Sequence, residues 1–302
     1  VYWNPGGLPF QYEDPEVDKK IGGTLMHVQW LPQFNLNDLY YDFAAFRYHW
    51  QDVGMLGFAI QFINYGENIQ TDNSGNEIGR FNSNEVAVTG SYSLKVTHNL
   101  GLGVNLKYIY SNLSPGVFVD AERQEGKGST FAFDVGTLWK PGFAKRLSFG
   151  LALSNIGPKM TYVDEAQADP LPTNFRLGFA YRLLHSEFNK LAFVYDMNRL
   201  LVNREGTKSD NVFKAMFYSS WTQGDLLKRF THSFGLEYWY TNLISLRGGF
   251  FYEDPKYGGR KFWTFGGGLR MSVLGVDFSY IYASADDHPL SDTMRFSLSF
   301  WF

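Results

Sequence analysis

The sequence contains no cysteine among its 302 residues, which excludes a disulfide framework and thiolate chemistry. It also has no run of about eighteen apolar residues, so an ordinary transmembrane helix is excluded. The formal net charge is −3, which gives no electrostatic footprint for binding nucleic acid. The chain opens on Val1-Tyr2-Trp3-Asn4-Pro5 without a signal peptide, and we interpret this as a chain whose beginning is missing, through processing or lack of order.

Aromatic residues and glycine are abundant, with 28 Phe, 19 Tyr, 8 Trp and 31 Gly. The mean hydropathy is nevertheless slightly negative, at −0.25. A transmembrane barrel fits this combination better than a helical membrane protein does, because every second residue of its strands faces a polar lumen. Single barrels of this length are common, so the chain needs no second compact domain.

The dominant period of the sequence is two residues. Leu102, Val104 and Leu106 alternate with Gly103 and Asn105, and the ranges 262–271 and 275–282 repeat the pattern. Such segments place an apolar surface on one face of a strand and a small or polar surface on the other. A soluble β-sandwich alternates as well, but here the segments are about ten residues long, and aromatic residues gather at their ends as in a membrane-interface girdle.

Counting these segments predicts an all-β fold, a fourteen-stranded antiparallel transmembrane β-barrel. The predicted strands are 22–31, 39–50, 54–66, 83–95, 101–111, 129–139, 147–156, 173–184, 190–201, 231–240, 244–253, 262–273, 275–283 and 293–302. Short connections then alternate with longer ones, the longer being 32–38, 67–82, 112–128, 157–172, 202–230, 254–261 and 284–292. This alternation is typical of outer-membrane barrels and places both ends of the chain on the periplasmic side. Residues 1–21 are then an N-terminal plug or periplasmic segment, and residues 22–302 form the barrel.

The last predicted strand ends on alternating aromatic residues. Phe300 and Phe302 are separated by Trp301, and the sequence stops on Phe302. Such an ending resembles the signal that the bacterial barrel-assembly machinery reads. The alternative is an ordinary edge strand that happens to come last.

The polar face of the strands carries charges of both signs. The predicted lumen residues are Glu85, Lys107, Asp134, Arg176, Arg182, Asp196, Glu237, Arg247, Arg270 and Asp277. A wide selective pore often shows a ring of one sign, whereas mixed charge favours a narrow lumen filled by paired groups and an inserted segment. Trp3, Asn4 and Pro5 do not fit a strand, and we interpret them as the remnant of a plug. A surface turn that leads into the first strand is the alternative.

Motifs for catalysis, cofactors or metals are missing from the sequence. The six His have no ligand spacing on one strand face, and there is no Gly-x-Ser-x-Gly elbow. Gly266-Gly267-Gly268 lacks the Lys and Ser or Thr of a phosphate-binding loop. We therefore expect no enzyme activity, no cofactor and no metal. A surface esterase or deacylase stays as the alternative, since a catalytic triad need not be local in sequence.

Several segments resemble known proteins. The Tyr2-Trp3-Asn4-Pro5 opening looks like the asparagine–proline element of FadL-like barrels, which have fourteen strands and an N-terminal plug. The chain is more specifically similar to the PorV/PorQ group of the type IX secretion system of Bacteroidetes, and closer to its PorV branch. The segments that carry this similarity are 30–31, 37–39, 84–88, 107–113, 154–160, 172–178, 235–240, 259–266 and 293–298.

The resemblance implies an integral outer-membrane protein with a non-enzymatic role in protein secretion. Its implied partners are the C-terminal signal domain of secreted cargo, the large translocon barrel and a surface attachment complex. Outer-membrane lipid and lipopolysaccharide would surround it, and no nucleic acid is expected. FadL-like transport of hydrophobic small molecules is the competing function, and it needs an apolar lumen with a lateral gap in the wall.

Long external connections are the places where such partners would bind. The candidates are 112–128, 157–172 and 202–230, since loops of this length are usually functional or disordered. Phe118, Tyr162 and Trp221 are the candidate anchors, because buried aromatic residues dominate interface energetics. The alternative is that these rings belong to the membrane-interface girdle or pack a loop.

Overall fold

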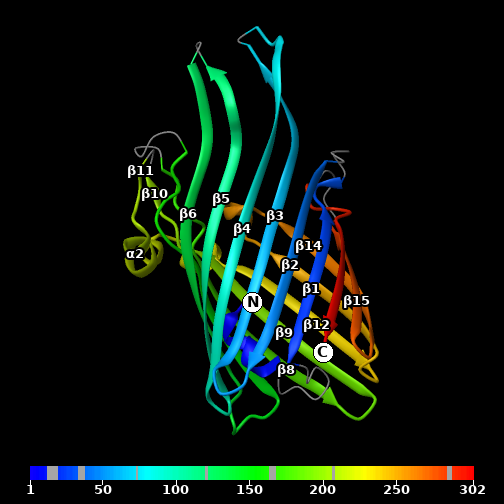
Figure 1. Ribbon diagram of the computed structural model, residues 1–302. Coiled ribbons are helices and arrows are strands. Elements are labelled where there is room, and N and C mark those ends of the chain that lie inside the picture. The colour runs from blue at the N-terminus through cyan, green and yellow to red at the C-terminus, as the bar shows by residue number, and fades with distance from the viewer. Residues whose placement is uncertain are drawn as a thin grey trace.

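A closed barrel of fourteen antiparallel strands forms the body of the protein in this computed structural model (Figure 1). Residues 1–11, 20–32, 38–72, 74–119, 122–162, 168–205, 208–283 and 288–302 are described, with only the backbone at 115–119, 122–125, 205 and 208. The strands are β1 (Ile21–Gln29), β2 (Leu39–Trp50), β3 (Gly54–Thr71), β4 (Glu77–Thr97), β5 (Leu100–Val119), β6 (Glu122–Trp139), β7 (Leu147–Ile156), β8 (Asn174–His185), β9 (Asn189–Leu200), β12 (Thr231–Tyr240), β13 (Ile244–Tyr252), β14 (Lys261–Met271), β15 (Leu274–Tyr282) and β16 (Met294–Trp301). The predicted fold and strand number are confirmed.

The barrel closes where the first strand meets the last. Strand β1 pairs with β16 from Gly22↔Trp301 to Val28↔Arg295. The backbones of Ile21 and Phe302 exchange two hydrogen bonds of 2.9 Å, which extends the ladder to the end of the chain. A Cβ atom on Gly23 would lie 2.2 Å from the Phe300 ring, so this ring covers the seam because position 23 is glycine. The terminal aromatic residues predicted as an assembly signal therefore also pack the closing seam.

The two-residue period separates a lipid-facing wall from a lumen. On β5, Leu102, Val104 and Leu106 are 42%, 48% and 64% exposed, whereas Asn105 and Lys107, at alternate positions, are 1% and 5% exposed. The outward side chains are apolar and the inward ones are polar. This is the arrangement that a strand crossing a bilayer requires. None of the helices in the described part of the chain is long and apolar enough to cross a membrane.

Two of the long connections predicted from the sequence are strands instead. The prediction of loops at 67–82 and 112–128 is wrong, because β3 runs on to Thr71 and β4 begins at Glu77, while β5 runs on to Val119 and β6 begins at Glu122. Asn, Ser, Gly and Pro115 in these stretches are typical of loops. The ladder between β5 and β6 accommodates Pro115 through register shifts at Ser114. Figure 1 shows the two resulting hairpins rising well above the rest of the barrel.

The external connection 202–230 also has structure of its own. It contains a two-stranded hairpin, β10 (Arg204–Glu205) and β11 (Lys208–Ser209), followed by α2 (Val212–Lys214), η4 (Ala215–Ser219), α3 (Ser220–Thr222) and η5 (Leu226–Arg229). A further short turn of helix, η6 (Pro255–Tyr257), lies in the next external connection. Met216 packs against Ile156 and Leu201, at the outer ends of β7 and β9.

An ion triad crosses the lumen face of β12 to β15. Arg247 Nε lies 2.6 Å from Glu237 Oε2, and its Nη1 lies 2.5 Å from Asp277 Oδ1. The second contact passes over β14, where a Cβ on Gly268 would lie 2.3 Å from Asp277 Oδ1. Gly268 of the Gly266-Gly267-Gly268 motif therefore provides room for Arg247 to reach Asp277 across β14.

Replacing Arg247 with Met should weaken the barrel. Glu237 and Asp277 would lose their shared cation, and two carboxylates would face each other in a partly closed lumen. We expect the temperature at which the folded, fast-migrating band disappears from unheated SDS gels to fall by roughly 2–4 °C. Adding Glu237→Gln and Asp277→Asn to Arg247→Met should recover most of the loss. An unchanged temperature for Arg247→Met alone would show that the triad adds nothing to stability.

Candidate functional site

The N-terminal segment lies inside the lower half of the barrel and forms a plug (Figure 1). It contains η1 (Pro5–Gly7) and α1 (Leu8–Gln11), which contact β3 to β6. Asn4 caps η1, because its Oδ1 accepts a hydrogen bond of 2.9 Å from Gly6 N. The Asn4 Nδ2 donates a hydrogen bond of 2.9 Å to the Thr137 carbonyl of β6. One asparagine therefore shapes the plug and ties it to the wall.

The wall accepts this plug because the facing positions on β5 and β6 are glycine. A Cβ on Gly103 would lie 2.4 Å from the Pro5 carbonyl carbon, and a Cβ on Gly101 would lie 2.4 Å from the Gly6 oxygen. On β6, a Cβ on Gly136 would lie 2.2 Å from Asn4 Oδ1. These distances are too short for any side chain, so the plug backbone rests directly on the strand backbone. We call Gly101, Gly103 and Gly136 the glycine seat.

Aromatic side chains hold the two ends of the plug. Phe10 lies between two cations, with Lys95 Nζ 4.7 Å and Lys140 Nζ 4.3 Å from its ring centre. Trp3 extends into the lumen, where the Arg176 guanidinium lies 4.4 Å above its ring and 62% of the residue is exposed. Cation–π contacts of this kind are worth about 0.5–1 kcal/mol at exposed sites. Trp3 is therefore the part of the plug that is exposed to the open lumen.

A buried charge network closes the wall beside the plug. The ladder between β6 and β7 shifts register between Phe133 and Val135, so Asp134 lies where regular pairing stops. Asp134 accepts hydrogen bonds from Asn105 Nδ2 at 2.7 Å and from the Asn155 backbone N at 2.8 Å. Lys107 Nζ lies 2.8 Å from both Asp134 Oδ2 and Asn155 Oδ1. The hydrogen bonds of these side chains take the place of regular backbone pairing between β6 and β7 at this point of the wall.

Asn155 makes this closure by adopting a left-handed backbone conformation. Its φ is +58°, a region that asparagine tolerates better than most residues. Its Nδ2 donates to the Pro172 carbonyl at 3.1 Å, and its own carbonyl accepts from Thr173 Oγ1 at 2.9 Å. Removing one member of a buried ion pair typically costs about 3–5 kcal/mol, so Lys107 and Asp134 hold the region strongly. Sequence reasoning placed Asn155 inside the predicted strand 147–156 and missed its role, because the strand pattern does not reveal a left-handed backbone conformation.

The other predicted lumen residues fall into separate places. Glu85 accepts from Ser111 Oγ at 2.6 Å and from Tyr65 OH at 2.7 Å, near the external end. Arg270 lies over the Trp239 ring at 4.2 Å. Arg182 is exposed and donates to the Lys145 carbonyl at the periplasmic rim, outside the enclosed lumen. Asp196 lies against Gly178, where no side chain would fit.

Two of the predicted partner anchors are packed into the protein. Tyr162 donates a hydrogen bond of 3.0 Å to Ser111 Oγ and packs beside Met160 and Leu171. Trp221 donates to the Met216 carbonyl at 2.6 Å and meets Phe175 edge to face. These contacts favour the alternative for both residues, in which the ring packs a loop. The Phe118 side chain lies outside the described residues.

Three exposed aromatic residues on the connection 202–230 were not identified from the sequence. Phe213, Phe217 and Tyr218 are 59%, 72% and 64% exposed, and they follow one another along α2 and η4. Their sequence signal is weak, since the segment lacks two-residue alternation and is too short for a clear helical pattern. They form an apolar external surface beside the ends of β7 to β9.

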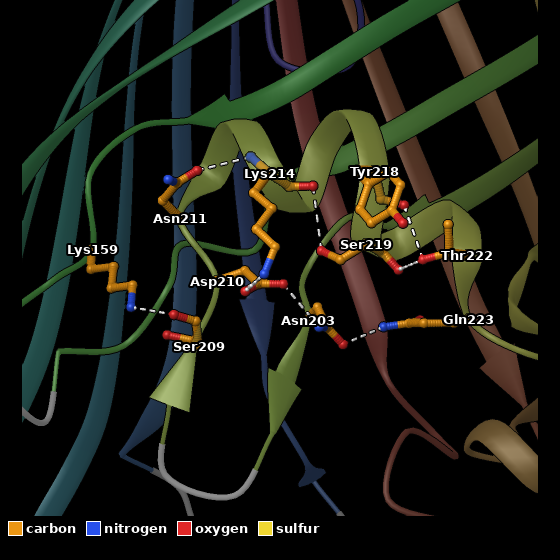
Figure 2. A network of polar contacts seen from close by, with 10 residues as sticks. All are labelled: Lys159, Asn203, Ser209, Asp210, Asn211, Lys214, Tyr218, Ser219, Thr222 and Gln223. Carbon is orange, nitrogen blue, oxygen red and sulfur yellow. Dashed lines mark hydrogen bonds and ion pairs between the residues drawn. The ribbon is translucent and has the colours of Figure 1, made fainter.

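A polar network fixes the shape of this connection (Figure 2). Asp210 accepts hydrogen bonds from Asn203 Nδ2 at 2.9 Å and from Lys214 Nζ at 2.8 Å. Gln223 Nε2 donates to Asn203 Oδ1 at 2.6 Å, and Lys159 Nζ donates to the Ser209 carbonyl at 2.7 Å from the neighbouring connection. The hydrogen bond from Asn203, followed by those from Lys214 and Ser219, holds the pKa of Asp210 below its ordinary value.

Removing this carboxylate should loosen the connection. Because the pKa of Asp210 is lowered, its stabilising effect is complete above the ordinary carboxyl pKa of about 4 and is lost only as the pH falls through the lowered value. We expect Asp210→Asn to speed hydrogen–deuterium exchange of residues 208–222 several-fold at pH 7. Wild-type protection, corrected for intrinsic exchange rates, should be equal at pH 7 and pH 5. A loss of wild-type protection already at pH 5 would contradict the assigned direction.

Disturbing the glycine seat should displace the plug. In Gly103→Ala the new Cβ meets the Pro5 backbone, whereas Gly90→Ala adds the same atom where nothing lies within 4 Å. We expect Gly103→Ala to raise hydrogen–deuterium exchange of residues 4–11 and to increase single-channel conductance in planar bilayers. Gly90→Ala should behave as the wild type, whose conductance should be small. A large wild-type conductance would contradict a filled lumen.

Together these features define a class, the plugged outer-membrane β-barrels with a FadL-like fold. Among solved structures, the Pseudomonas putida toluene transporter TodX is similar, with a TM-score of 0.56, 10% identity, and coverage of 99% of this chain and 93% of that chain. The monoaromatic hydrocarbon channel CymD is also similar, with a TM-score of 0.53, 10% identity, and coverage of 99% and 97%. At such identities the likeness concerns the fold alone. No curated protein sequence matches the chain.

The particular family follows from the sequence match. The family described as type IX secretion system protein PorV matches residues 2–206, which is more than half of the chain. The matched range includes the plug, the glycine seat and the Lys107–Asp134–Asn155 network. The chain therefore belongs to the PorV family of type IX secretion system outer-membrane proteins.

Proposed function

We propose that the protein is a non-enzymatic carrier that binds the C-terminal signal domain of secreted cargo at the large translocon barrel and delivers it to a surface attachment complex. Membership of the PorV family supports a place in type IX secretion. The plug and the Lys107–Asp134–Asn155 network also support this role, because the plug occupies part of the lumen and the network closes the wall beside it. Within the described residues, no three His, Asp or Glu side chains come together as a metal site.

The observation that carries this proposal is the pair of hairpins that project above the barrel. Strands β4 and β5 pair up to Asn84↔Asn112, and above that point each pairs only within its own hairpin among the residues described. The edges at 77–82 and 114–119 therefore present backbone groups toward external solvent. Exposed strand edges are templates for adding a further strand. A cargo domain built of strands would find its main-chain partners there.

Transport of hydrophobic small molecules is less well supported. It would need an apolar path through the lumen and a gap in the wall. The lumen instead carries the Glu237–Arg247–Asp277 triad, and the break between β6 and β7 is filled by Lys107, Asp134 and Asn155. Hydrophobic ligand found inside the barrel after purification would favour transport over the carrier role.

Shortening one projecting hairpin should separate cargo binding from barrel folding. Replacing residues 115–125 with Asn-Gly joins Ser114 to Gly126, which already pair across β5 and β6, through a two-residue turn. We expect the shortened protein to lose at least tenfold in affinity for a purified cargo signal domain, measured by biolayer interferometry. Its heat-modifiable mobility on SDS gels should stay unchanged, because the ladder below Asn112 is intact.

The control alters a different external connection, the one that contains η6. Replacing residues 256–258 of the η6 turn with Asn-Gly leaves both tall hairpins in place and should preserve cargo affinity. Equal affinity in the wild type and the shortened-hairpin variant would refute the assigned binding surface. Recovery of the protein alone from native membranes, without a very large barrel protein identified by mass spectrometry, would argue against the secretion role itself.

A further inference from the structure

An apolar groove of about 520 Å³ opens on the outer wall across the closing seam. It spans β15, β16, β1, β2 and β3, and its outward lining includes Leu25, Ala44, Ile60, Phe62, Phe296 and Leu298. Its volume lies within the range of about 300–1,000 Å³ that is typical of ligand pockets. The lumen-side features described above take no part in it.

The groove exists because one small residue interrupts a row of large ones. Strand pairing places Leu298, Leu25, Ala44 and Ile60 side by side on β16, β1, β2 and β3. Leu25 and Leu298 are 50% and 41% exposed, and Ile60 is 38% exposed, so all three project outward. Ala44 between them has only a methyl group. The wall is therefore dented at this position.

A polar pair lies at the upper rim of the dent, on the same outward face. His27 Nδ1 lies 2.7 Å from Asp42 Oδ1, and the two side chains are 62% and 45% exposed. Their neighbours in the same row are Phe296 on β16 and Phe62 on β3. Ionisable groups among lipid-facing aromatic residues are costly and mark functional sites by default.

The row above this pair on the same outward face is polar. Gln29, Tyr40 and Asn64 are paired there across β1, β2 and β3. His27 and Asp42 therefore lie at the external edge of the apolar band on these strands. The groove extends from them toward the middle of the bilayer.

We propose that this groove binds one outer-leaflet glycolipid, with an acyl chain over Ala44 and a hydroxyl or amide near the headgroup bonded to Asp42 and His27. The groove opens on the lipid-facing wall, so bilayer lipid is what contacts it, and the apolar lining suits an acyl chain. The Asp42 carboxylate can accept a hydrogen bond from a hydroxyl or amide group of the lipid, and the His27 ring can form a second hydrogen bond with the same group. This pair therefore suits an acyl chain that is hydroxylated or amide-linked. A phosphatidylethanolamine chain carries no such group at that depth.

The test measures bound lipid by native mass spectrometry. The full chain is delipidated in detergent and incubated with vesicles that contain lipid A, or with vesicles of phosphatidylethanolamine alone. We expect about one lipid A per chain to be retained, and at least fivefold less phosphatidylethanolamine. Ala44→Phe, which fills the dent, and Asp42→Leu, which removes the acceptor, should each reduce lipid A retention at least fivefold.

The matched control is Val88→Phe, which adds an aromatic ring in the same outward row, two strands away from Ala44. It should retain lipid A as the wild type does. Heat-modifiable mobility on SDS gels verifies that each variant is folded, and Asp42→Leu keeps the test decisive if Ala44→Phe fails to fold. Three results would each overturn the proposal. They are equal retention of both lipids, equal retention of lipid A by all variants, and protection of the groove from hydrogen–deuterium exchange only when another protein is bound.

Discussion

The hydrocarbon core of a bilayer offers no hydrogen-bond partner to a backbone N–H or C=O group. A sheet that crosses it must pair every strand on both sides, and the Ile21–Phe302 and Gly22↔Trp301 pairing at the seam meets that requirement. Closure in turn creates an inside and an outside, so each two-residue repeat sends one side chain to lipid and the next to the lumen. The polar lumen, the plug and the external hairpins all depend on this single constraint.

The same constraint explains why the wall needs side chains between β6 and β7. Where the ladder shifts at Asp134, backbone groups lose their regular partners. The Asp134 carboxylate accepts the Asn155 N–H, and Lys107 neutralises the charge that this places in a dry region. A related barrel that opened laterally at this point would have to leave such groups to water or ligand. Here the network makes the wall continuous at this point.

Glycine has a common role in three parts of the molecule. In the seat at Gly101, Gly103 and Gly136 it lets the plug backbone touch the wall, and at Gly268 it lets Arg247 reach Asp277. At Gly23 it lets the Phe300 ring cover the seam. In each case a missing Cβ converts a strand surface into space for another group. The spaces at the glycine seat and at Gly268 lie on the lumen face and are filled by other parts of the protein.

The sequence by itself determined the barrel, its fourteen strands and the identity of the two faces, because a two-residue period is written directly into residues such as Leu102, Asn105 and Leu106. It also indicated the plug, since Asn4 and Pro5 break the strand pattern. Only the tertiary structure decided where β3 to β6 end, because Pro115 and its neighbours look like loop residues until an antiparallel partner pairs with them. Three other features likewise depend on the tertiary structure: the hydrogen bonds of Asn155, the packed positions of Tyr162 and Trp221, and the groove over Ala44. Each brings together segments that are far apart in sequence, and no local sequence pattern predicts the register in which they meet.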